Sequence, residues 1–217
     1  MSPRSSLRPA GLLAVCASLC ASSFAAPTAL NSIPSTDVLG HREASLVYTL
    51  AGTERKISKR YSHANSLQLG LFDRLEFGFD NDFDGFTPLN LKVGLAMPGD
   101  VKRLPGLALC AGYANHDGLA AEPYVVFSHP VACGRLTCGY AHSGGRHRAL
   151  LGWDQEIMRD TVLMLDHTSS VNGFTWVGLS YNIAAVPGLS VWVGAARPNT
   201  SGDGTQHSAS LTYNFRF

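Results

Sequence analysis

The sequence has little charge of either sign. Only 15% of its 217 residues are Asp, Glu, Lys or Arg, against roughly a quarter in an ordinary soluble domain. The 17 basic and 16 acidic residues nearly cancel, whereas a nucleic-acid-binding domain needs a basic excess. Hydrophobic residues reach 45%, which argues against a disordered chain. We therefore expect a folded protein with no nucleic-acid partner.

Regular metal-ligand spacings are absent too. The eight histidines form no recurring His-x-His or His-x₃-His pair, and no Cys-x₂-Cys occurs, so the pattern indicates no zinc site and no cofactor. Beyond residue 25 the cysteines are Cys110, Cys133 and Cys138, and an odd number precludes a fully paired disulfide set. Unpaired thiols are the favoured interpretation, with a Cys133–Cys138 or a Cys110–Cys133 bridge as alternatives.

The first residues have the signature of a secretory signal peptide. Arg4 and Arg8 flank the start of an apolar stretch at 10–21, and Ser23-Phe24-Ala25 supplies small residues for cleavage. The stretch is shorter than the ~20 residues that a membrane-spanning helix needs, and no longer apolar run follows it. We expect residues 1–25 to be removed after export to the periplasm, leaving one domain at residues 26–217.

The rest of the chain is built from short segments in which apolar residues alternate with polar or small ones. Gly, Asn, Asp and Pro clusters separate these segments, as expected for antiparallel strands joined by turns. The predicted strands are 43–50, 66–71, 75–80, 89–97, 107–113, 124–127, 136–140, 149–153, 161–166, 175–183, 189–194 and 210–217.

The second face of these strands decides the fold class. A soluble sheet places Lys and Glu on its solvated face, but here that face is mostly Gly, Ser, Ala, Asn and Thr. Small polar residues suit the interior of a barrel, and the apolar face then meets lipid. We predict an all-β fold, a single closed antiparallel transmembrane β-barrel of twelve strands, with ten as the alternative. A secreted soluble β-sandwich that binds ligands is the competing fold.

The lengths of the connections support a barrel independently. Long connections, such as 53–62, alternate with short ones, such as 72–74, as in membrane barrels with long loops on one side and short turns on the other. With twelve strands, both chain termini fall on the short-turn side.

The last strand resembles a known signal. Leu211-Thr-Tyr213-Asn-Phe215-Arg-Phe217, with an aromatic final residue, resembles the C-terminal assembly signal of bacterial outer-membrane β-barrel proteins, in which Tyr213, Phe215 and Phe217 are the signal residues. Segments 70–78 and 166–198 also look like pieces of small porin-like barrels. The resemblance implies an outer-membrane location, contact with outer-membrane lipids and the barrel-assembly machinery, and a small passive channel or structural barrel. Its narrow polar lumen would pass small solutes or ions.

An outer-membrane enzyme that acts on lipid is the alternative function. Such an enzyme needs a Ser nucleophile with a His base, and His142-Ser143 is the nearest candidate. Adjacent residues of a strand point to opposite faces, and the spaced His-x-Ser pattern of the outer-membrane phospholipase is absent. We therefore assign no catalytic residue.

The lumen offers a candidate charge-selecting constriction at Glu76, Lys92, Asp80 and Arg216. Pairing the third and fourth strands across their loop places Glu76 opposite Lys92, and such a cross-strand ion pair would fix register. A structural role for the pair is favoured over ion selection. Trp176 and Trp192 fall on the inward face, where they would fill the barrel or stack on a solute.

A weak metal candidate lies between the third and fourth strands. Asp80, Asp82 and Asp84 precede Gly85 with the spacing of the first half of a calcium loop. Position twelve of that loop would be Leu91 in place of the bidentate Glu, so a polar loop is the favoured interpretation. The histidines on or near the long-loop side are interpreted as scattered rim residues: His63, His116, His142, His147, His167 and His207.

Overall fold

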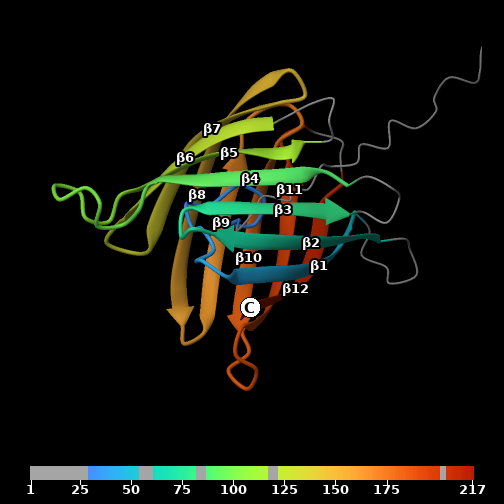
Figure 1. The fold of residues 1–217 in the computed structure, drawn as a ribbon. Helices are drawn as coiled ribbons and strands as arrows, with labels where there is room; N and C mark the ends of the chain where they lie inside the picture. The colour runs from blue at the N-terminus through green and yellow to red at the C-terminus, as the bar shows by residue number, and fades with distance from the viewer. Residues whose placement is uncertain (1–28, 54–60, 82–86, 117–121, 201–203) are drawn as a thin grey trace, which may run out of the picture.

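The computed structural model describes residues 29–53, 61–81, 87–116, 122–200 and 204–217, and the predicted signal peptide lies outside these ranges. The described chain forms a closed antiparallel barrel of twelve strands (Figure 1). The strands are β1 Glu43–Gly52, β2 Ser62–Leu71, β3 Leu75–Asn81, β4 Leu89–Ala96, β5 Ala108–His116, β6 Glu122–Pro130, β7 Arg135–Ser143, β8 Arg146–Met158, β9 Thr161–Thr168, β10 Phe174–Asn182, β11 Leu189–Pro198 and β12 Gln206–Arg216.

The predicted fold class and strand number are confirmed. Each strand pairs with its sequence neighbours, and β1 pairs with β12 from Glu43↔Arg216 to Gly52↔His207. A β-sandwich has free sheet edges, so this closure excludes the soluble sandwich. None of the described residues forms a helix that could span a membrane.

The sequence prediction was wrong about the ends of β7 and β8. It placed a connection at 141–148, but only Gly144 and Gly145 separate the two strands. Both glycines have positive φ, 56° and 70°, which suits the two-residue turns that continue strand pairing up to the bend. His142 and His147 are therefore cross-strand partners within the sheet.

The two faces of the barrel wall differ as predicted. Outward side chains are large, apolar and solvent-accessible in the isolated chain, as at Leu46, Leu151, Val177 and Leu211, which are between 44% and 50% exposed. Inward residues are small or polar. An apolar outer band around a polar interior is the arrangement that lipid requires of a spanning barrel, and closure satisfies the backbone hydrogen bonds within the wall.

The connections define two ends of the barrel. The short-turn end contains the connections 72–74, 97–107, 131–134, 159–160 and 183–188, and the long-loop end contains the others. The connection 97–107 extends outward as the green loop at the left of Figure 1. The terminal segments meet at the short-turn end, where Phe217 N donates to Arg42 O at 3.0 Å, as predicted.

The residues before β1 form the one large feature that sequence analysis missed. Residues 29–42, which we call the plug, lie inside the ring of strands. Their first part is a tight hairpin with a bridge between Ala29 and Pro34, and Leu30 N donates to Ile33 O at 3.0 Å. Ile33 is fully buried in an apolar cluster with Leu150 and other wall residues. The plug and the wall therefore form a small hydrophobic core inside the barrel.

All three cysteines within the described residues are free thiols. Cys110 is buried and its Sγ donates to the plug carbonyl Thr36 O at 3.1 Å. Cys133 is exposed and Cys138 is half-buried. Neither of the two alternative disulfide bridges forms.

Candidate functional site

The tip of the plug is fixed by polar side chains of the wall. Ser32 donates from its backbone N and its Oγ to the two carboxylate oxygens of Asp166, at 2.8 and 3.0 Å. Trp192 Nε1 donates to Asn31 Oδ1 at 3.0 Å. A Cβ on Gly178 would lie 2.0 Å from Asn31 Oδ1, so only glycine leaves room for the tip at this position.

The predicted inward tryptophans lie together beside this tip. The rings of Trp176 and Trp192 are 5.8 Å apart, and Trp176 is buried. The hydrogen bond to Asn31 gives the Trp192 indole N–H the partner that a buried tryptophan requires. In this conformation Trp192 therefore binds the protein's own plug.

The middle of the plug contacts the predicted Glu76–Lys92 pair. The predicted register of β3 and β4 is confirmed, with Glu76 opposite Lys92. Both side chains are fully buried, and Lys92 Nζ lies 4.0 Å from Glu76 Oε2. The plug adds a hydrogen bond to each of them, because Leu39 N donates to Glu76 Oε2 at 3.1 Å and Lys92 Nζ donates to Asp37 O at 2.7 Å.

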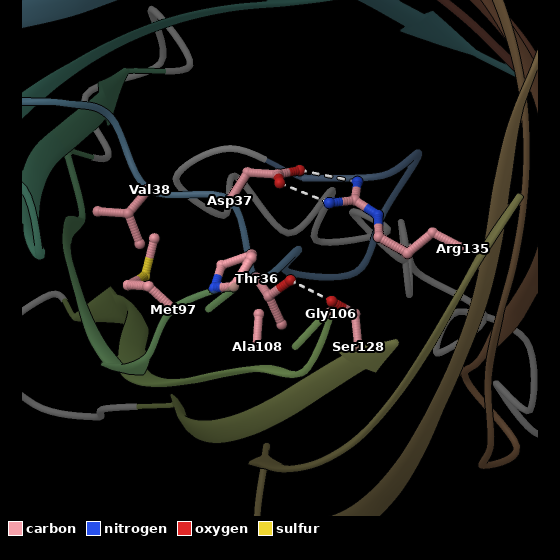
Figure 2. Close-up of a pocket in the computed structure, with 9 residues that line it drawn as sticks. Thr36, Asp37, Val38, Met97, Gly106, Ala108, Ser128 and Arg135 are labelled. Atoms are coloured by element: carbon pink, nitrogen blue, oxygen red, sulfur yellow. Dashed lines mark hydrogen bonds and ion pairs between the residues drawn. The ribbon is translucent and has the colours of Figure 1, made fainter. Parts of the chain in front are cut away.

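An ion pair near the short-turn end joins the plug to β7. Arg135 donates to both carboxylate oxygens of Asp37, at 2.5 and 2.8 Å (Figure 2). It also donates through Nε to Asp154 at 3.0 Å. Burial alone would raise the pKa of Asp37, but the hydrogen bonds and charge of Arg135 outweigh it and lower that pKa below its usual range. Beside the pair is a cavity of about 190 Å³ lined by Thr36, Val38, Met97 and Ser128, among others.

The other members of the predicted constriction lie elsewhere. Asp80 is buried on β3 and accepts a hydrogen bond from Asn90. Arg216 is at the short-turn mouth, where its side chain is 78% exposed and donates to Glu43 Oε1 at 2.8 Å. The structure thus brings Glu76 and Lys92 together but leaves Arg216 apart from them.

The plug lies against one side of the lumen, which we call the closed wall (β3 to β9). Most of its inward side chains are at most 9% exposed, whether apolar or charged: Glu76, Asp80, Asn90, Lys92, Cys110, Val126, Ser128, Thr137, Leu150, Met164 and Asp166.

The opposite side, which we call the open wall (β11, β12, β1 and β2), is lined differently, and β10 lies between the two walls. Small side chains, most with hydroxyl groups, face inward and stay partly accessible: Val47, Thr49, Ala64, Ser66, Ser190, Ser208, Ser210 and Thr212. Several of them bond to one another or to the wall, as Thr49 Oγ1 does with Ser210 Oγ at 2.8 Å. Sequence analysis had identified the small inward residues but could not tell which of them the plug would cover.

The remaining residues singled out from the sequence do not form a metal or catalytic site within the described residues. Asp82 and Asp84 lie outside the described residues, and within the described ranges no three His, Cys, Asp or Glu side chains could hold a metal ion. Ser143 is buried and its Oγ donates to Glu122, whereas His142 is on the opposite face beside His147. Of the assembly-signal residues, Tyr213 and Phe217 are exposed on the outer face, and the Tyr213 and Phe215 rings stack.

No protein-family model and no curated protein matches the sequence. Solved structures do match the fold. The KdgM porin in complex with disordered oligogalacturonate superposes with a TM-score of 0.54 at 11% identity, over 79% of this chain and 99% of the porin chain. The NanC porin gives a TM-score of 0.53 at 12% identity, over 80% of this chain and 100% of that one. The chain therefore has the fold of a porin-like outer-membrane β-barrel.

Proposed function

We propose that the protein is a small outer-membrane channel whose path runs between the plug and the open wall. The observation that supports this path is the division of the lumen. The closed wall is largely buried against the plug, whereas many inward residues of β11, β12, β1 and β2, such as Thr49 and Ser210, remain partly accessible. A path beside a fixed plug is narrower than the barrel bore, so only small solutes pass.

The lining of the path suggests which solutes these are. Hydroxyl groups such as those of Thr49 and Ser210 can replace part of a hydration shell without imposing a charge preference. Two cations of the closed wall already bind the plug, because Arg135 donates to the Asp37 carboxylate and Lys92 donates to the Asp37 carbonyl. We therefore assign small neutral solutes and ions to the channel, rather than an acidic oligosaccharide like the one bound to the KdgM porin.

The location follows from the same features. We assign cleavage after Ala25, passage through the periplasm, and recognition of Tyr213, Phe215 and Phe217 by the barrel-assembly machinery. The outward apolar band then contacts membrane lipid. The separation of His142 from Ser143 leaves the lipid-acting enzyme without its nucleophile–base pair.

Single-channel recording tests the path. Residues 26–217 are refolded in detergent and added to a planar lipid bilayer, alone and with Ser210→Trp or Ala209→Trp. We expect small discrete steps from the unmodified chain. Ser210→Trp places a large side chain on the open wall and should reduce the step size several-fold, whereas the neighbouring Ala209→Trp faces lipid and should leave it unchanged.

Two results would contradict the channel. A folded, inserted but silent protein would make the barrel structural. Equal steps from the unmodified chain and from Ser210→Trp would show that solutes do not follow the open wall.

A further inference from the structure

Outside the lumen, a band of histidines follows the long-loop end of the barrel. His63, His142, His147, His167 and His207 each lie one residue from a strand end at that side. They share the outward face with exposed apolar residues of their own strands, as His147 does with Leu151 and His167 with Leu165. Arg197 lies in the same band on β11. We call these residues the donor rim.

Strand pairing brings several members of the donor rim close to one another. His142 pairs with His147, and their Nδ1 atoms are 3.4 Å apart. Thr175 pairs with His167 on one side and with Arg197 on the other. His207 follows on β12, and His63 on β2 lies beyond β1. The rim therefore extends over the eight adjacent strands from β7 through β12 and β1 to β2.

Neighbouring hydroxyl groups set the chemistry of three of these rings. His63 Nδ1 lies 2.6 Å from Tyr48 OH, and His167 Nδ1 lies 2.8 Å from Thr175 Oγ1. His147 Nδ1 is hydrogen-bonded to Tyr140 OH. A hydroxyl that donates to Nδ1 leaves the proton of a neutral imidazole on Nε2. Where the hydroxyl donates in this way, the ring offers its Nε2 N–H as a donor.

Within the described strands, the outer surface around the donor rim has no carboxylates that would compete for these donors. Outward positions of β7 to β12, β1 and β2 carry no Asp or Glu, and Arg197 is their one permanently charged side chain. On β9 the apolar band begins at Leu165, two residues from His167, which is about 7 Å along a strand. The donor rim thus lies just beyond the apolar band, at the level of the lipid headgroups.

We propose that the donor rim binds phosphate groups on the headgroups of outer-leaflet lipids. Phosphate oxygens accept hydrogen bonds strongly, and an arginine pairs with them in a bidentate manner. A surface that offers imidazole N–H groups and one guanidinium, with no competing carboxylate, complements that anion. This binding does not depend on conduction through the lumen.

Lipid retention tests the proposal at neutral pH. Refolded residues 26–217 are mixed with phosphorylated lipid A, or with lipid A stripped of its phosphates, and bound lipid is measured after gel filtration. The test variant combines His63→Phe, His147→Phe, His167→Phe and Arg197→Leu, which keep bulk but remove the donors. His129→Phe is the matched control, because His129 faces outward on β6 at the short-turn end.

We expect the unmodified chain and His129→Phe to retain phosphorylated lipid A, and the combined variant to retain about tenfold less. Heat-dependent mobility on a gel verifies that each barrel is folded, and Arg197→Leu alone carries the measurement if the combined variant does not fold. The proposal is overturned by equal retention of the two lipids, by an unchanged variant, or by inorganic phosphate alone binding as tightly as the lipid.

Discussion

The closed and open walls of the lumen are built from the same kind of strand, yet they have opposite interiors. The closed wall presents long, charged or apolar side chains such as Lys92, Glu76 and Leu150, all fully or almost fully buried. The open wall presents hydroxyl groups that remain accessible. Within one barrel, the size of the inward-facing side chains therefore distinguishes the wall that binds the plug from the wall that leaves room in the lumen.

Removal of the plug is the strongest test of this difference. Deletion of residues 29–38 takes away the apolar core around Ile33 and the partners of Arg135 and Lys92. We expect single-channel conductance to rise several-fold and thermal stability to fall, because buried charges lose their compensation. A deletion variant that folds and conducts like the intact chain would show that the plug does not narrow the lumen.

Lys92→Ala should cause the largest loss of stability among single substitutions. Glu76 would stay buried without its neighbouring cation, a situation that costs about 3–5 kcal/mol. Ser210→Ala on the open wall should cost less than about 0.5 kcal/mol. Urea unfolding of both variants in detergent gives the comparison, and similar midpoints would contradict the assigned difference between the walls.

Gly70→Ala should have an intermediate effect. A Cβ at Gly70 would lie 2.1 Å from Gly40 O and 2.6 Å from Leu39 O, and backbone atoms cannot move aside as a flexible side chain does. We expect a loss of about 1–3 kcal/mol and a more accessible lumen. Gly204→Ala is the control, because its nearest neighbouring atom would be 3.7 Å away.

Acidification should have the smallest effect. The pKa of Asp37 in the folded protein is below its ordinary value of 3.8, so its stabilising bond to Arg135 is fully present above that value. The bond is lost only as pH falls through the lower pKa of the folded state. Conductance should therefore not respond to Asp37 between about pH 5 and 8. It should rise only as pH falls below 3.8 and through the lower pKa of the folded state, and Asp37→Asn should remove that response.

Sequence reasoning succeeded where the signal was local. Period-two alternation predicts all twelve strands, and counting across the loop between β3 and β4 predicts Glu76 opposite Lys92. It failed at β7 and β8, because alternation weakens near Gly144 and Gly145 although pairing continues. Elements with a repeating pattern are predictable in this way, and their ends are less so.

The plug has no such pattern. Its contacts join residues far apart in sequence, such as Ser32 and Asp166, which are 134 positions apart. The inward Glu76–Lys92 pair was the one available signal, since charges placed inside a barrel need further hydrogen bonds when they are buried. That signal asks for a partner but does not say which segment provides it.

The position of the plug also constrains the order of folding. It is continuous with β1, and the barrel closes only when β1 meets β12, the last strand made. Residues 29–42 bond to β3, β7 and β9 from the inner side, so we expect them to dock against these strands before β1 and β12 close the seam. The segment would then act as an internal template around which the strands curve, and a barrel that closed before the segment docked would have to admit it through the short-turn end.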